Sequence, residues 1–151
     1  MFGALAVIWM AGVSHSALQA KSASDRGQVV AAPGGAKTVW DGVFSKEQAE
    51  RGAAVYKTSC SECHGNDLAG DGFAPALAGG EFIGNWNDLS VGDLFERIRI
   101  SMPPSGPASV TPAQKADIVA HLMNQNKFPA GQGELEPKTE ALKLIKNENK
   151  K

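Results

Sequence analysis

The stretch Cys60-Ser61-Glu62-Cys63-His64 contains the only two cysteines of this 151-residue chain. Two cysteines three residues apart lie about one helical turn from each other, and the histidine follows the second one directly. The pattern C-x-x-C-H is typical of the covalent attachment of a c-type haem. We therefore expect one haem c, bound by thioethers from Cys60 and Cys63, with His64 as the proximal ligand of the iron.

Two other uses of a C-x-x-C pair fit the sequence less well. A zinc site needs about four ligands. Besides the cysteines the chain offers His64, His121 and His15, the last in a segment that we expect to be removed. A thioredoxin-like redox pair belongs in a strand-helix-strand context, and no strand-rich pattern precedes Cys60. The haem interpretation is favoured over both.

The N-terminal segment, residues 1–20, is strongly apolar and contains no Lys, Arg, Asp or Glu. It is too short for a comfortable membrane span, and Ala20 supplies a small residue for cleavage, so we expect a secretory signal peptide. A start a few residues upstream, or a retained membrane anchor, would account for the missing basic residues. We accordingly expect a periplasmic or otherwise exported protein.

The rest of the chain divides into a linker, one domain and a tail. Residues 21–38 are rich in Ser, Ala and Gly, which indicates a flexible linker. The folded domain is expected over residues 39–128. Residues 129–151 are expected to form a partly disordered tail, with an amphipathic piece through Thr139 to Ile145.

The charge of the chain is nearly balanced, with 15 basic and 16 acidic residues and a formal net charge of −1. There is no basic stripe or repeated Arg cluster, which argues against nucleic acid as a partner. Contact with a membrane is expected only if the N-terminal segment is retained.

Three main helices are predicted, without a convincing strand, so the fold class is all-α. The first begins at Ser45, where Ser45–Gln48 matches a capping box. The second begins near Ser90 and ends at Met102-Pro103-Pro104, because proline cannot continue a helix. The third begins at Thr111–Gln114, a capping box with proline at the first helical position. Their apolar faces comprise Ala49, Gly52, Ala53 and Tyr56; Val91, Leu94, Phe95 and Ile98; and Ile118, Val119, Leu122 and Met123.

Met102 is the residue that we expect to be the second axial ligand. Met1 and Met10 fall in the expected signal peptide, and Met123 lies on the apolar face of the third helix. Met102 follows a helix directly and precedes two prolines, which fix the backbone and can hold the thioether towards the iron. It fits the His/Met class of haem ligation better than the less favoured alternative, His121.

From about Val39 to Phe128 the sequence resembles a class I, mono-haem cytochrome c domain. The resemblance rests on Cys60–Gly65, Ala74–Leu77, Met102-Pro103 and the flanking terminal helices. It implies a cytochrome c-like fold, with three main helices around a covalent haem. In that family the terminal helices cross near a Gly/aromatic pair, here Gly52 and Tyr56. Their partner in the last helix would be His121-Leu122, where the family usually has an aromatic beside a leucine.

The resemblance also implies contacts around the haem. The Pro75 carbonyl would accept the N–H of the proximal imidazole and fix the ring orientation; a turn proline without haem contact is the alternative. Trp86 and Arg97 are predicted to contact the propionates, because an indole N–H or a guanidinium can bind a carboxylate. Arg99 is the alternative to Arg97, and either arginine would otherwise be solvated.

Filled axial positions predict a carrier of single electrons and not an enzyme, because oxygen or peroxide finds no open site. Expected partners are redox proteins, a dehydrogenase, an oxidase or another cytochrome, met in small transient encounters with little electrostatic steering. Residues 39–44 resemble cytochrome domains associated with quinoprotein dehydrogenases, which would make the chain the cytochrome subunit of such an enzyme. The alternative, a haem enzyme or a gas- or peroxide-binding sensor, requires a displaceable Met102.

Overall fold

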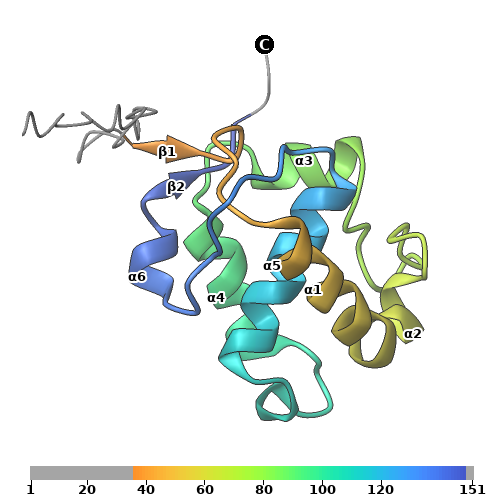
Figure 1. The fold of residues 1–151 in the computed structure, drawn as a ribbon. Coiled ribbons are helices and arrows are strands. Elements are labelled where there is room, and N and C mark those ends of the chain that lie inside the picture. The colour runs from red at the N-terminus through yellow and green to blue at the C-terminus, as the bar shows by residue number, and fades with distance from the viewer. Residues whose placement is uncertain (1–35, 149–151) are drawn as a thin grey trace, which may run out of the picture. The chain divides into compact units, whose positions relative to one another are not determined.

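The computed structural model describes residues 36–148, so the expected signal peptide, most of the expected linker and residues 149–151 lie outside the described residues. The chain is mostly helical, as the sequence predicts (Figure 1). The elements in chain order are β1 (Lys37–Thr38), α1 (Lys46–Ser59), α2 (Ser61–His64), α3 (Gly80–Trp86), α4 (Val91–Ser101), the 3-10 helix η1 (Pro107–Ser109), α5 (Pro112–Gln125), α6 (Thr139–Leu142) and β2 (Ile145–Lys146). The three longest helices, α1, α4 and α5, are the three that the sequence predicts.

Side-chain caps begin each of the three long helices. Thr111 and Gln114 form the predicted reciprocal capping box of α5, and Ser90 forms another with Asp93 at the start of α4. At α1 only half of the predicted box is present, because Ser45 accepts from the backbone N–H of Gln48 at 3.0 Å. The Gln48 side chain binds elsewhere, as described below.

Helices α1 and α5 cross in close contact at Gly52, in agreement with the expected crossing of the terminal helices (Figure 1). A Cβ atom at Gly52 would overlap the backbone carbonyl of Asp117, so only glycine allows the two backbones to approach this closely. One turn further along, the Tyr56 ring lies 5.2 Å from the His121 ring, centre to centre. His121 therefore takes the place of the aromatic residue that the family usually has in the last helix.

The segment after Phe128 differs from the predicted tail, because residues 129–148 pack against the domain. Leu135, Leu142 and Ile145 are buried there. The Gln48 amide donates to the Leu135 carbonyl at 3.0 Å and accepts from the Leu135 N–H at 2.8 Å, as a strand partner would. The sequence predicts an amphipathic piece through Thr139 to Ile145, where the structure has α6. It does not predict the packing at Leu135, because a single apolar residue in an irregular segment shows no helical or strand period.

Two short strands close this side of the domain, although no strand was expected. β1 pairs in parallel with β2, with Lys37 opposite Ile145. The indole N–H of Trp40 donates to the Glu148 carbonyl at 2.8 Å, and its ring meets Phe128 edge-on at 4.9 Å. Strands of two residues are too short to show an alternating pattern in the sequence.

The core is contributed chiefly by α1, α4, α5 and the C-terminal segment. Its largest fully buried side chains include Phe44, Phe95, Leu122, Met123 and Leu142. Burial of Met123 on α5 agrees with its interpretation as a packing residue. In the described part of the chain no helix has the length and apolar character needed to cross a membrane.

Candidate functional site

His64 ends α2, the single turn that carries the CSECH motif. The turn follows α1 with only Cys60 between them, and Gly65 leaves it with a φ of 76°, which favours glycine. The Tyr56 hydroxyl donates to the Gly65 carbonyl at 2.7 Å, so α1 fixes the backbone beside the histidine. Burial raises the pKa of Tyr56 to about 12, and the hydroxyl therefore stays a donor at any physiological pH.

The imidazole of His64 is held by the chain that follows it. Nδ1 lies 2.9 Å from the Pro75 carbonyl oxygen. Since a carbonyl only accepts, Nδ1 carries a proton, and in the neutral ring Nε2 is then the nitrogen with the lone pair. His64 is only 8% exposed, and Nε2 makes no hydrogen bond within residues 36–148. The histidine is thereby prepared as a metal ligand through Nε2, because the bond at the other nitrogen sets the tautomer and the ring orientation.

The segment between His64 and Pro75 folds back because of one glycine and one aspartate. A Cβ atom at Gly70 would overlap the Ala74 carbonyl, and the φ of Gly70 is 74°. The Gly70 N–H donates to the His64 carbonyl at 3.0 Å. Asp71 accepts from the backbone N–H groups of Phe73 and Ala74, and these bonds lower the pKa of its carboxyl. The loop is therefore shaped by backbone geometry and local hydrogen bonds.

Asn126, at the C-cap of α5, ties the end of this segment to the helical core. Its side chain accepts from the Gly79 N–H at 2.9 Å and donates to the Leu77 carbonyl at 3.0 Å. It also donates to the Leu122 carbonyl of its own helix at 2.8 Å. The sequence analysis missed this residue, since an asparagine after a helix is usually only a cap. Asn126 fixes the backbone a few residues beyond Pro75.

Cys60 and Cys63 are free thiols on the same helical turn as His64. Cys60 is half-buried against the core, and burial raises the pKa of its thiol. Cys63 is exposed. Within the described residues no group of three or more His, Cys, Asp or Glu side chains is placed to hold a metal ion. Two thiols one turn apart, beside a histidine whose Nε2 is available, form a donor set that fits a covalent haem.

Met102 lies at the C-cap of α4, where its N–H donates to the Ile98 carbonyl at 3.0 Å. The residue is half-buried and begins the loop that leads through η1 to α5. Two prolines follow it, as the sequence shows, and end the helix at this point. Its assignment as an iron ligand stays a prediction.

Comparison with known families bears on the stretch that holds all these residues. Residues 47–122 match the family described as "Cytochrome C oxidase, cbb3-type, subunit III". This is half of the chain, and it runs from the first turn of α1 to the Leu122 turn of α5. The chain belongs to this cytochrome c family. Comparison with curated proteins and with solved structures gave no match.

Membership confirms the resemblance to a class I cytochrome c domain and its all-α fold. A cytochrome c domain implies a haem cofactor and electron transfer through it. The matched residues include Cys60, Cys63, His64, Pro75 and Met102. The C-terminal segment that packs on Gln48 follows the matched stretch.

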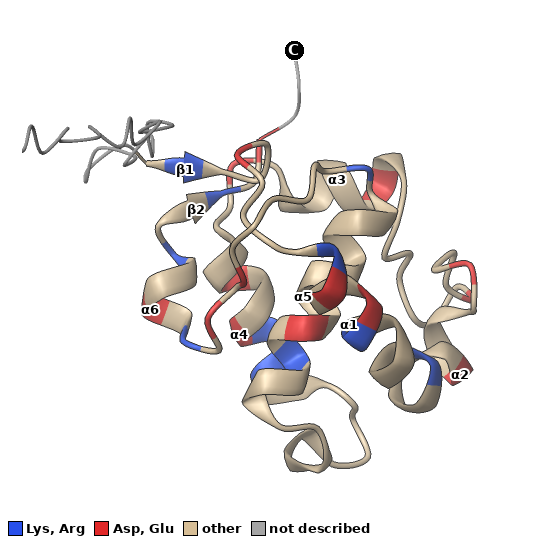
Figure 2. Cartoon of the chain, viewed as in Figure 1, with Lys and Arg blue, Asp and Glu red and all other residues tan. Residues whose placement is uncertain are grey.

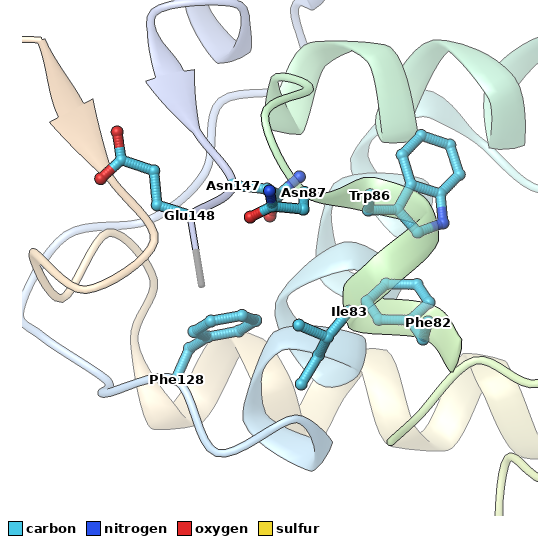
Figure 3. A pocket seen from close by; sticks show the side chains of 7 residues that line it. All are labelled: Phe82, Ile83, Trp86, Asn87, Phe128, Asn147 and Glu148. Carbon is cyan, nitrogen blue, oxygen red and sulfur yellow. The ribbon is translucent and has the colours of Figure 1, made fainter. Parts of the chain in front are cut away.

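The expected propionate contacts of this cytochrome domain stay predictions. Trp86 lies on α3 with its ring 6.3 Å from the Phe82 ring. Figure 3 shows Trp86 among the side chains that line a small cavity, together with Ile83, Phe128 and Asn147. The volume of this cavity is about 10 Å³. Arg97 is exposed on α4. Arg99, the alternative, forms a bidentate ion pair with Glu96, in which Nε and Nη2 of the guanidinium donate to the two carboxylate oxygens at 2.7 and 2.6 Å.

Proposed function

We propose that this protein is an exported c-type cytochrome that carries single electrons through one covalently bound haem. Cys60 and Cys63 would hold the haem by thioethers, and His64 and Met102 would be the axial ligands of its iron. Haem bound in this way supplies a reversible one-electron couple at a closed, six-coordinate iron. A site closed by both ligands would support a carrier of electrons and not an enzyme.

The hydrogen bond between His64 Nδ1 and the Pro75 carbonyl, 2.9 Å long, is the observation that carries this proposal. It fixes the tautomer, orients the ring and makes Nε2 a stronger ligand. The same bond would have no purpose in a disulfide-forming C-x-x-C pair. Hydrogen bonds of Tyr56, Gly70 and Asn126 fix the backbone near this bond, which would limit movement of the ligand when the charge of the iron changes.

The proposed partners are redox proteins, a dehydrogenase, an oxidase or another cytochrome, and the charge pattern suggests what their docking faces look like. From residue 58 to residue 96 the chain has seven Asp and Glu residues and no Lys or Arg. Figure 2 shows acidic and no basic positions on the loop between α2 and α3. The stretch from residue 58 to residue 96 is therefore acidic although the net charge of the chain is near neutral. Such a stretch would favour a partner with basic residues around its own redox centre.

Absorption spectra of the purified protein, oxidised and reduced, test the proposed haem site. We expect a c-type spectrum with the weak sulfur-to-iron band in the far red, unchanged by carbon monoxide. The Met102→Ala variant should lose that band and bind carbon monoxide when reduced. A parent spectrum that shifts with carbon monoxide would instead favour a ligand-binding or catalytic haem.

Mass spectrometry of the protein recovered from the periplasm tests export and attachment together. We expect the mass of a chain that begins near Lys21 plus one haem, with no change after the denatured protein is extracted with acidified solvent. A haem that is lost on extraction would contradict the thioether bonds to Cys60 and Cys63. A mass that includes residues 1–20 would contradict cleavage of a signal peptide.

A further inference from the structure

We propose that Lys115 is a positioning residue for the axial ligand Met102, because it ties together the two ends of the loop that begins with this methionine. This inference rests on the proposed ligation of iron by Met102. Lys115 is on the first turn of α5 and is only 2% exposed. Its Nζ donates to the Arg99 carbonyl at 2.9 Å and to the Pro107 carbonyl at 2.7 Å. Met102 lies in the chain between these two carbonyls.

The other hydrogen bonds of this loop are short-range. Met102 N–H donates to Ile98 at 3.0 Å, Gly106 N–H to Pro103 at 3.1 Å, and Ser109 N–H to Gly106 at 2.9 Å. Each of these joins residues three or four positions apart. Within the described chain, Lys115 is the one side chain that bonds both to backbone of α4 and to backbone of the loop between Met102 and Val110. The path of the loop therefore depends on this one ammonium group.

A lysine side chain is well suited to binding two backbone carbonyls at once. An ammonium has three donors and no acceptor, so it can satisfy two carbonyls at once. Arg99 lies in the last turn of α4, where carbonyls have no partner in the helix. Burial, and after it the charge of the nearby Arg99, lowers the pKa of Lys115, because burial disfavours the charged form of an amine. A buried charge is tolerated when it is well hydrogen-bonded, and both carbonyls would lose their partner without it.

A loop that has lost this tie should open more often, because local opening depends on the few bonds that must be broken. Each opening would move the Met102 thioether out of the position in which it is proposed to bind the iron, and an added ligand could then take its place. We expect an increase in imidazole affinity of at least about ten-fold on removal of the ammonium. This is the change that corresponds to loss of one hydrogen bond from a charged donor.

The test uses the haem-loaded full chain and the variants Lys115→Met and Lys115→Gln. Both replacement side chains reach one atom less far than lysine and are neutral. Methionine has no N–H donors, whereas glutamine keeps them. Lys46→Met is the matched control, since Lys46 is exposed on α1 and its replacement changes the net charge equally. Imidazole titration of the oxidised proteins, the far-red band, the reduction potential and global stability in urea are measured for each.

We expect imidazole affinity to rise in the order parent, Lys115→Gln, Lys115→Met, with a weaker far-red band and a lower potential in the same order. Lys46→Met should match the parent. Parent-like affinity in Lys115→Met would overturn the proposal, and so would a loss of urea stability without a change in affinity. If Lys115→Met does not fold, parent-like affinity in Lys115→Gln overturns it. A parent without the far-red band overturns the His64/Met102 assignment itself, which separates the two failures.

Discussion

The crossing of α1 and α5 and the loop from His64 to Gly79 lie next to each other and are held by different means. At the crossing, regular helices meet through side-chain packing, and Gly52 lets the backbones touch. In the loop, few side chains are buried, and the backbone is fixed by hydrogen bonds to the side chains of three residues. Tyr56 donates such a bond, whereas Asp71 and Asn126 accept theirs from backbone N–H groups. Side-chain packing holds the helices of the domain together. The hydrogen bonds of the loop determine the direction in which the His64 imidazole points.

The packed crossing and the hydrogen-bonded loop contribute to different properties, the first to the stability of the fold and the second to the orientation of the His64 ring. Most of the free energy of unfolding should come from apolar residues in α1, α4, α5 and the C-terminal segment, because burial of apolar surface is the dominant favourable contribution. The bonds of the loop contribute less to stability, but they fix the tautomer and ring plane of His64. Substitutions in the two regions should therefore have effects of different size and kind.

The largest effect is expected at the crossing. Gly52→Val should lower the free energy of unfolding by more than about 4 kcal/mol, because the new side chain meets backbone at Asp117 that cannot rotate away. Gly84→Ala, on α3, is the control, since a Cβ there meets nothing within 4 Å. Urea denaturation followed by circular dichroism measures both. Equal stability of the two variants would show that the helices do not cross at Gly52.

The C-terminal segment should behave as part of the packed region. Leu142 is 1% exposed and Leu144, two residues later, is 71% exposed. Leu142→Ala should cost about 3 kcal/mol of unfolding free energy through lost burial and the cavity left behind, and Leu144→Ala less than about 0.5 kcal/mol. The same urea measurement applies. If both changes are harmless, residues 129–148 are a tail after all.

Asn126 tests the boundary between the two regions. Asn126→Ala leaves the Leu77 carbonyl and the Gly79 N–H without their partner, at a cost of about 2 kcal/mol. Asn124→Ala, exposed in the last turn of α5, is the control and should change little. We also expect a changed imidazole signal of His64 by NMR in Asn126→Ala alone. An unchanged signal would mean that the loop holds its shape without α5.

The smallest effect is expected at Glu96, which joins α4 to α6. Hydrogen bonds from Arg99 and Thr139 lower the pKa of this carboxyl from its ordinary value of 4.5 to about 2. A lowered pKa stabilises the fold above pH 4.5, and this contribution is lost as the pH falls towards 2. Glu96→Gln should therefore lower the urea midpoint slightly at pH 6 and not at pH 2. A difference that is constant with pH would contradict this assignment.

The sequence predicted the regular region well because regular structure repeats. Capping residues at Ser90 and Thr111 and apolar spacing around Val119 identify helices without knowledge of tertiary contacts. The motif at Cys60–His64 is equally local, so the candidate site could be found from five consecutive residues. The crossing at Gly52 came from the family resemblance and agrees with the structure.

The contacts that the sequence did not predict join residues far apart in the chain. Gln48 completes a capping-box pattern, yet its amide binds Leu135, 87 positions away. Lys115 stands four and seven positions before Val119 and Leu122, which places it on the apolar face of the predicted helix. A lysine on that face is unusual, and this is the one signal of its role that the sequence contains. Its two carbonyl partners were not visible, because backbone groups leave no trace in the sequence. Side-chain to backbone bonds across long separations are the class of interaction that pattern analysis misses.

The parallel pairing of β1 with β2 brings residues 37 and 145 side by side. The described chain thus enters and leaves at one corner of the domain (Figure 1). A unit with neighbouring ends can be inserted into a surface loop of a host protein, or have its ends joined and its chain reopened elsewhere, without unravelling the core. This cytochrome c domain is therefore suited to insertion into a surface loop of a designed protein, with both of its ends joined to the host at one place.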